Sequence, residues 1–196
     1  MHSSIGAITR RKAASLLLGA ACLPSAARVR AAPVSGRMLG KYRGQVPESF
    51  NRLASYGGVR TGNLKAVGRN TAYIIFDPRC GVCKGVYRES LQYGTKAAIK
   101  WIPVNVLRSG AQTEQQAASV LVGGDAARAN LKTVMAGGVP QVKVTQKMRV
   151  QLRENEALLK AFGLGTAVPL AIFLNRVSQT PSTLLRFNMV DLYGRL

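Results

Sequence analysis

Two cysteines separated by two residues, Cys80 and Cys83, are the side chains of this sequence best suited to chemistry. They lie between an apolar run that ends at Phe76 and a segment from Lys84 that is typical of a helix. A helix beginning here would place the Cys80 sulfur near unpaired backbone N–H groups and the positive end of the helix dipole, which favours thiolate. Cysteines in such motifs have pKa values of about 3.5 to 7.5. Cys80 is therefore the predicted attacking nucleophile. Cys83, one turn later, is the predicted resolving cysteine, which closes back onto Cys80 as a disulfide and expels a bound thiol.

Other chemistries of this cysteine pair have less support. A closed zinc site needs four ligands, and the chain adds only Cys22 and its single histidine, His2, so zinc would require a dimer that shares two pairs. An inert structural disulfide and copper carriage by two thiolates stay open as alternatives. Catalysis by a Ser-His-Asp or Cys-His arrangement is excluded downstream of His2, because both need an imidazole base. We expect neither a metal nor a cofactor.

The elements around the cysteines predict a parallel strand pair. The apolar run from Ala72 to Phe76 suits a strand buried on both faces. A helix from Lys84 to Tyr93 and a second β-branched run from Ala97 to Val106 follow. The helix is long enough to act as the crossover that parallel strands need, and Pro103 indicates that the second strand ends there or lies at an edge. The cysteines would then lie at the carboxyl edge of the sheet, where open α/β folds place their sites.

Two further helices are predicted after this pair. They run from Gln112 to Val122 and from Asp125 to Ala136, split by Gly123-Gly124, with Asp125 as the N-cap. They are expected to form a helical insertion over the active edge.

The last third returns to strand. Val139 to Val150 is predicted to be loop or weak strand, and Asn155 is predicted to cap a short helix from Glu156 to Phe162. A strand from Leu170 to Leu174 and a hairpin partner from Leu184 to Val190 complete the pattern.

Residues 1–32 resemble an export signal. Arg10-Arg11-Lys12 supplies a basic region, Ala13 to Leu23 a short apolar region, and Val29-Arg30-Ala31 a small-residue cleavage pattern. The paired arginines fit a twin-arginine signal, with Sec export equally open; lipidation at Cys22 is a further alternative. The sequence therefore predicts an exported, periplasmic protein in a compartment where disulfides persist.

The formal net charge of the 196-residue chain is +20, and removing the five basic residues of residues 1–32 leaves +15. Such a field attracts acidic proteins, anionic lipid or nucleic acid. The basic residues are scattered singly and have no interleaved aromatic platform of the kind that grips single strands. Nucleic acid is therefore not an expected partner.

Taken together, these motifs resemble the thioredoxin superfamily, and within it periplasmic thiol:disulfide interchange proteins of the DsbG and DsbC type. That family carries a Phe-x-Asp-Pro-x-Cys-x-x-Cys-Lys-like stretch, matched by residues 76–84 with one residue fewer before the aspartate. It also has a helix with Asn and Leu before a Gly-Thr-Pro loop, matched by Asn155, Leu158, Gly165 and Val168-Pro169. The likeness covers about residues 70 to 190.

The resemblance implies substrate-binding roles for two residues. Pro169 would be a cis-proline facing the disulfide, and Val168 would offer its backbone to an incoming peptide in strand-like pairing. The family's DsbG and DsbC members usually have threonine where Val168 stands, whereas valine is familiar in the oxidant DsbA. The direction of the redox reaction therefore stays open.

The expected organisation is a signal at 1–32, a lead-in segment at 33–69 and an α/β thioredoxin-like domain at 70–196, with a helical insertion between the CxxC half and the cis-proline half. The lead-in is too short for the family's dimerisation domain, and the chain stops soon after the last predicted strand, where relatives add a helix. We predict a monomeric thiol:disulfide interchange enzyme that acts on cysteine-containing proteins and is served by a membrane redox partner. The alternative is a redox-inactive thioredoxin-like binding module of an envelope assembly.

Overall fold

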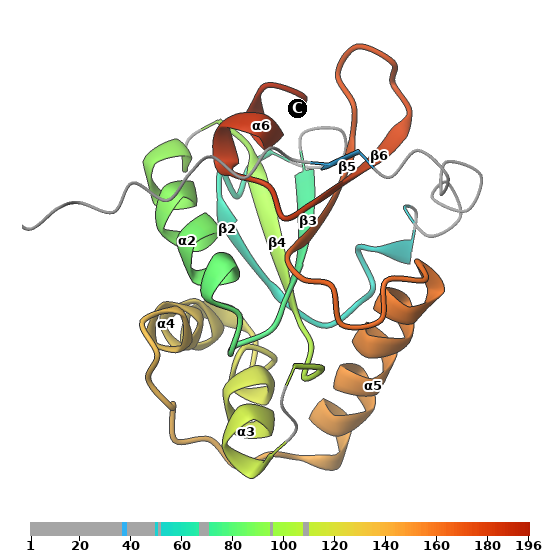
Figure 1. Ribbon diagram of the computed structural model, residues 1–196. Helices are drawn as coiled ribbons and strands as arrows, with labels where there is room; N and C mark the ends of the chain where they lie inside the picture. The colour runs from blue at the N-terminus through green and yellow to red at the C-terminus, as the bar shows by residue number, and fades with distance from the viewer. Residues whose placement is uncertain (1–36, 39–49, 51, 67–70, 95, 108–109) are drawn as a thin grey trace, which may run out of the picture. The chain divides into compact units, whose positions relative to one another are not determined.

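The computed structural model describes residues 37–38, 50, 52–66, 71–94, 96–107 and 110–196, all within the unit Ala32–Leu196. The predicted signal, with His2 and Cys22, lies outside these residues. The described strands form one sheet of six in the order β1-β6-β5-β3-β4-β2 (Figure 1).

The centre of the sheet is built from the most apolar runs of the sequence. All six residues of β3 (Thr71–Phe76) are buried, and β3 pairs in parallel with β4 (Ala98–Pro103). On its other side β3 pairs antiparallel with β5 (Leu170–Leu174), whose first four residues are buried. The predicted parallel pair is confirmed, and β4 ends at Pro103 as its proline requires.

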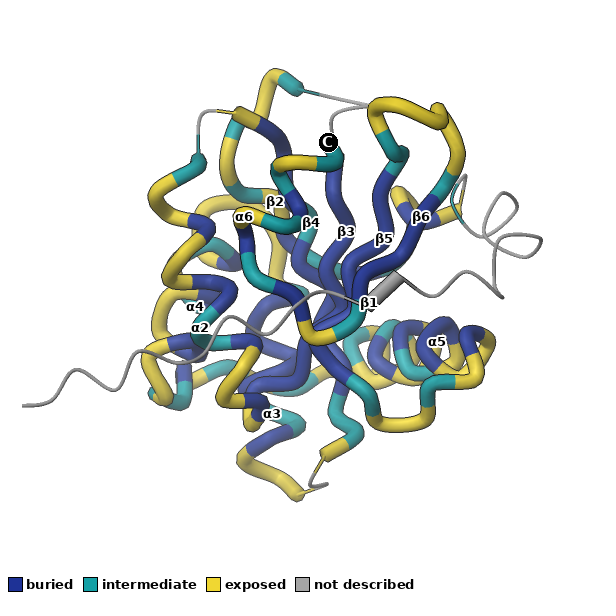
Figure 2. The backbone as a smooth tube through the Cα atoms, turned by 45° about the horizontal axis from the view of Figure 1, so that its top comes forward, coloured by how far each residue is buried: buried dark blue, intermediate teal, exposed yellow. Residues whose placement is uncertain are grey.

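Helices cover both faces of the sheet. α2 (Gly81–Ser90) continues into the 3-10 turn η3 (Leu91–Tyr93) and forms the crossover from β3 to β4. Its Tyr87 packs edge-on against Trp101 of β4, which in turn meets Phe76 of β3. α4 (Gly124–Met135) lies on the same side as α2, and α5 (Gln146–Ala161) lies on the other (Figure 1). The buried strands between these layers form the core (Figure 2).

The insertion between β4 and β5 is helical, as predicted, and consists of α3 (Ala111–Ser119), α4 and α5. The expected cap of α4 is wrong. Gly123, not Asp125, is the N-cap, and Asp125 lies within the first turn. Gly123 and Gly124 have positive φ angles of 86° and 57°, which glycine adopts readily. This glycine turn precedes α4 in place of the expected side-chain cap.

The prediction for residues 139–162 is wrong in one respect. α5 begins at Gln146 rather than Glu156, and Thr145 caps it by accepting a hydrogen bond from the Met148 N–H. Asn155, the predicted cap, is instead a fully buried residue in the middle of the helix. The first half of α5 is mostly polar and largely exposed, so it has few apolar residues at helical spacing. The sequence pattern therefore underestimates the length of the helix.

The carboxyl-terminal hairpin is shifted from the prediction. β6 (Pro181–Leu185) pairs antiparallel with β5, and the expected end of this strand instead forms α6 (Met189–Tyr193), capped by Asn188. A short helix therefore does follow the last strand. The Glu89 carboxylate on α2 accepts a hydrogen bond from the Met189 N–H at 2.9 Å, which attaches α6 to α2.

Residues of the predicted lead-in contribute both outer strands. β1 (Arg37–Met38) pairs with β6, and β2 (Val59–Gly62) pairs antiparallel with β4. Gly58 is required just before β2, because a Cβ there would lie 2.2 Å from the Trp101 carbonyl oxygen. Among the described residues no helix is long and apolar enough to cross a membrane.

Candidate active site

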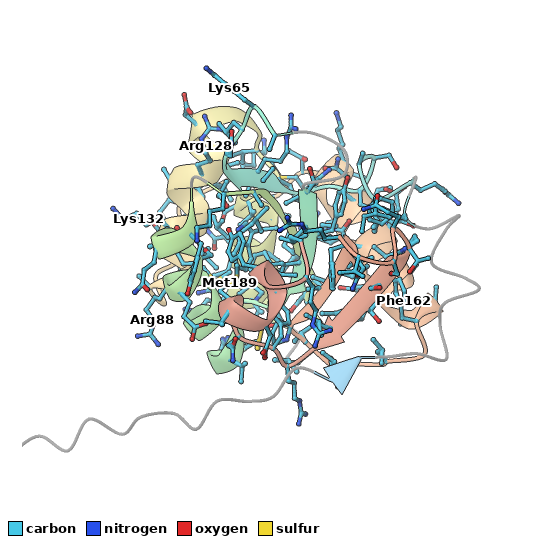
Figure 3. All side chains as sticks on the ribbon, turned by 90° about the horizontal axis from the view of Figure 1, so that it is seen from above. Lys65, Arg88, Arg128, Lys132, Phe162 and Met189 are labelled. Atoms are coloured by element: carbon cyan, nitrogen blue, oxygen red, sulfur yellow. A yellow bond between two sulfur atoms is a disulfide. The ribbon has the colours of Figure 1, made fainter. Side chains whose placement is uncertain are left out.

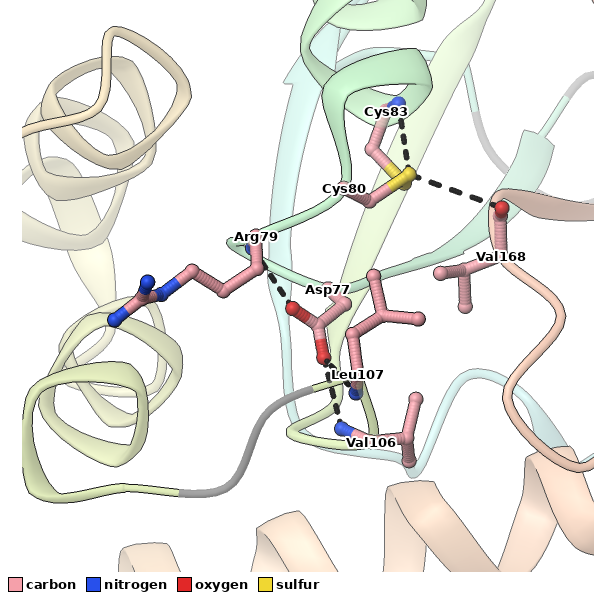
Figure 4. The surroundings of a disulfide bond; sticks show 7 residues. All are labelled: Asp77, Arg79, Cys80, Cys83, Val106, Leu107 and Val168. Atoms are coloured by element: carbon pink, nitrogen blue, oxygen red, sulfur yellow. Dashed lines mark hydrogen bonds between the residues drawn. A yellow bond between two sulfur atoms is a disulfide. The ribbon is translucent and has the colours of Figure 1, made fainter.

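The predicted redox cysteines lie at the turn between β3 and α2. Cys80 is the N-cap of α2, and its sulfur accepts a hydrogen bond from the Cys83 N–H at 3.1 Å (Figure 4). The first turn of α2 contains no acidic residue. The sulfur therefore lies at the positive end of a ten-residue helix with no nearby first-turn carboxylate, a position that stabilises thiolate over thiol.

Cys80 and Cys83 are joined in a disulfide, with their Cα atoms 5.2 Å apart. Cys80 is 6% exposed and Cys83 is fully buried. A thiolate approaching from solvent can therefore reach the sulfur of Cys80 but not that of Cys83. This asymmetry fits the order of roles predicted from the sequence.

The second predicted motif faces the first across the edge of the sheet. The Val168–Pro169 peptide bond is cis, as predicted, and the Val168 carbonyl oxygen lies 3.7 Å from the Cys80 sulfur (Figure 4). The Pro169 carbonyl accepts a hydrogen bond from the Arg186 N–H, but within the described residues the Val168 N–H donates none. The Val168 backbone is thus adjacent to the disulfide at the active edge of the sheet.

Asp77, which the sequence analysis treated only as part of the motif, holds the site together. Its carboxylate is fully buried and accepts hydrogen bonds from the Arg79 N–H at 2.8 Å, the Val106 N–H at 2.8 Å and the Leu107 N–H at 3.0 Å. One carboxylate therefore attaches the cysteine turn to the loop that leaves β4. Its position directly after a buried strand was the only available signal.

A second carboxyl group, Glu156 of α5, supports the same loop. Its Oε1 atom accepts a hydrogen bond from the Asn105 N–H at 3.3 Å. Burial raises the pKa of Glu156, the Asn105 N–H lowers it, and the charge of Asp77 raises it further. With Thr166 and Gly165 of the cis-proline loop, Asn105 and Glu156 line a cavity of about 710 Å³ beside the site.

Arg79 links the cysteine turn to the helical insertion. Its Nε donates a hydrogen bond to the Thr113 hydroxyl at 3.2 Å, and its Nη2 donates one to the Gln112 side chain at 3.4 Å. The insertion thus borders the active edge, as expected. No group of three or more His, Cys, Asp or Glu side chains in the described part of the chain is placed to hold a metal ion.

The fold is mixed α/β and thioredoxin-like. Two features define it: a parallel β3-α2-β4 unit with a CxxC at the start of its helix, and a strand preceded by a cis-proline that faces this CxxC. Solved structures share this fold. One is a disulfide interchange protein from Neisseria gonorrhoeae, with a TM-score of 0.55 and 18% identity over 72% of this chain and 93% of that one. The thiol-disulfide exchange protein alpha-DsbA2 from Wolbachia pipientis gives a TM-score of 0.57 and 12% identity over 79% and 94%.

Pseudomonas aeruginosa DsbA2 matches with a TM-score of 0.55 and 14% identity over 69% of this chain and 90% of that chain. No protein-family model and no curated protein sequence matches this chain. The similarity is thus one of fold, and the chemistry must be argued from the site itself.

Proposed function

We propose that this protein is an exported enzyme that exchanges disulfides with cysteine-containing proteins. The observation that carries the proposal is the Cys80 sulfur, which caps α2 and faces the Val168 carbonyl at 3.7 Å. The disulfide exchange named for the structural neighbours is consistent with this chemistry. We assign Cys80 as nucleophile, Cys83 as resolving residue, and Val168 and Pro169 as the client-binding edge.

In the oxidising direction, a client thiolate attacks the Cys80 sulfur and the Cys80–Cys83 bond breaks, releasing Cys83 as a thiolate that takes up a proton. A second client thiolate then attacks the client sulfur of the mixed disulfide and releases Cys80 as a thiolate. The client loses two electrons and gains a disulfide, and the cysteine pair gains the two electrons. Reduction is the same sequence reversed, and isomerisation returns the pair to its starting state.

Two single substitutions test the assignment. Cys83→Ser should accumulate a mixed disulfide with client proteins that carry a disulfide, because the Cys80 thiolate attacks that disulfide and nothing then resolves the adduct. Cys80→Ser should trap none. The adducts are counted by non-reducing electrophoresis and mass spectrometry, with the double substitution as the blank. Equal trapping by both variants would instead favour the redox-inactive binding module.

The finer assignment is also a proposal. We propose a signal at residues 1–32, export by the Tat or Sec route to the periplasm, and a membrane redox partner that resets the cysteine pair. The lead-in at 33–69 contributes edge strands to the sheet of the domain at 70–196, and we propose that it does not dimerise the chain. Kinship with DsbG and DsbC rests on the motif at residues 76–84.

A further inference from the structure

A cavity of about 500 Å³ opens beside the edge strand β2, away from the cysteine pair. It is formed by β2, β3, β4 and the start of α4. The residues that line it and bear on its chemistry are Arg60, Thr71, Tyr73, Lys100, Gly123-Gly124 and Arg128. Neither cysteine and neither residue of the cis-proline motif is among its lining residues.

Three cationic residues from three elements line this cavity. Arg60 of β2 and Lys100 of β4 are directly opposite in the strand register, and Arg128 comes from α4. The Lys100 ammonium donates a hydrogen bond to the Ala54 carbonyl at 2.7 Å. Burial lowers the pKa of Lys100, and the neighbouring Arg60 charge lowers it further. The cavity thus holds like charges near one another, at an electrostatic cost that a bound anion would remove.

The cavity has little negative charge of its own. Among the described residues that line it there is no carboxylate. Asp125, an exposed residue that is not part of the lining, forms an ion pair with Arg128. Three cations with one carboxylate outside the cavity leave two positive charges unbalanced.

Uncharged donors complete the lining. Tyr73 lies beside Lys100 in the strand register, is 8% exposed and lines the cavity. Thr71 adds a second hydroxyl. α4 begins here without a side-chain cap, and a Cβ at Gly123 or Gly124 would meet no atom within 4 Å. The positive end of the α4 dipole therefore faces open space at the same cavity.

From this lining we infer that the cavity is a binding site for a phosphate monoester. The two unbalanced positive charges match a dianion rather than a single carboxylate. Arg60 can bind two phosphate oxygens at once, and Lys100 and the Tyr73 hydroxyl supply single donors. The cavity is large enough for the phosphate and a small organic group. A soluble metabolite and a lipid headgroup can both present this ester, and they share its chemistry.

Calorimetry tests the inference by measuring the binding of glycerol 3-phosphate to the full-length protein. The ionic strength is held constant, and glycerol is the uncharged control. Wild-type protein should bind glycerol 3-phosphate saturably. Arg60→Gln and Lys100→Gln should each weaken binding at least about tenfold, the loss expected for a charged phosphate contact. Lys147→Gln removes the same charge from an exposed site on α5 and should leave the dissociation constant unchanged.

A thermal-unfolding series keeps the test decisive if Lys100→Gln folds poorly through loss of its bond to Ala54. Glycerol 3-phosphate should raise the melting temperature of wild type and Lys147→Gln but not of Arg60→Gln, an exposed edge position. Phosphatidic acid vesicles distinguish the two sources of the ester. Vesicle binding that requires Arg60 supports a lipid headgroup. Absence of vesicle binding, with glycerol 3-phosphate still bound, supports a soluble ester. Equal binding by all variants, or no binding by wild type, would overturn the inference.

Discussion

Asp77 shows how one side chain can fix the geometry of the proposed active site. Its carboxylate accepts three backbone hydrogen bonds, from Arg79 in the cysteine turn and from Val106 and Leu107 in the loop after β4. Asp77→Ala leaves these three N–H groups without their acceptor. We expect it to lower the free energy of unfolding by about 2 to 4 kcal/mol, measured by urea denaturation of the oxidised protein.

The matched control is Asp125→Ala, because Asp125 is an exposed carboxylate that forms only a surface ion pair with Arg128. Its loss should cost less than about 1 kcal/mol. Similar losses for the two variants would show that the buried acceptor role of Asp77 is not what stabilises the turn.

The raised pKa of Glu156 leads us to expect a free energy of unfolding that depends on pH with a definite sign. Burial and the charge of Asp77 raise its pKa above the ordinary 4.5, so the folded state binds this proton more tightly than the unfolded state. Its contribution to stability is present below pH 4.5 and is lost as the pH rises through the folded pKa. Glu156→Gln should match wild type at pH 4 and become relatively more stable toward pH 7.

The measurement is the difference in the free energy of unfolding between wild type and Glu156→Gln at several pH values, since other titrating groups cancel in the difference. Glu154→Gln, which makes the same change at an exposed neighbour on α5, serves as the control for the substitution itself. A Glu156→Gln difference that moves the opposite way would mean that the ionised carboxylate stabilises the fold.

The sequence predicted the parts of the site that are local in the chain. The CxxC and the Val-Pro dipeptide are short motifs, and both were located correctly. The structural role of Asp77 was missed because its partners Val106 and Leu107 are 29 and 30 residues away. Such a contact depends on how β3 and β4 end at the same edge, which residue types alone do not encode.

At the scale of elements, α5 is joined to the sheet by Asn155. The side-chain amide donates hydrogen bonds to the Gly57 carbonyl at 3.0 Å and the Pro103 carbonyl at 2.8 Å. It thus ties the middle of the helix to the end of β4 and to the approach to β2. This is also why a residue favoured at helix ends occupies a helix interior here.

Asn155→Ala should therefore destabilise the fold by about 2 to 3 kcal/mol, because two buried carbonyls lose their donor. Asn155→Leu fills the space with apolar volume but donates nothing, and it should not restore stability. Glu154→Ala on the exposed side of the same helix should change stability by less than about 0.5 kcal/mol. Urea denaturation compares the three, and full stability of Asn155→Leu would show that packing, not hydrogen bonding, holds α5.

Strongly apolar elements were the predictable ones. β3, β4 and β5 match their predicted positions closely, because their buried runs dominate any local preference. α2 was predicted as a helix but begins three residues earlier, at Gly81 rather than Lys84. α5 and β6 were misplaced, since the first half of α5 is polar and Leu184 to Val190 spans a strand end, a turn and a helix start. In both cases tertiary contacts, through Asn155 and through Glu89, set the element bounds.

At the scale of the whole molecule, the acidic residues are used internally. Of eight acids, Asp77, Glu89 and Glu156 accept backbone hydrogen bonds, whereas ion pairs of the described residues use Glu114 and Asp125. Most of the 28 lysines and arginines are consequently not neutralised by the protein itself. Figure 3 shows Arg88 and Lys132 pointing outward in this way. The surface therefore repels other copies of the chain and favours acidic clients.

This charge, together with the short lead-in, leads us to predict a monomer. A monomer with one accessible sulfur should reduce insulin efficiently and reshuffle scrambled ribonuclease poorly, because little holds a client during repeated attack. Light scattering of residues 33–196 at micromolar concentration, paired with both assays, checks this. A stable dimer with efficient reshuffling would contradict it and indicate an isomerase.

The strand order also constrains how the chain can fold as it is made. β1 and β2 come first in the sequence, yet their partners are β6 and β4, so neither can pair until residues far downstream have emerged. The β3-α2-β4 unit is the first part able to form from neighbouring residues, and it already contains both cysteines. Once this unit has formed, β2 can pair with β4, whereas β1 must still wait for β6, so the β1-β6 edge is the last part of the sheet that can be completed.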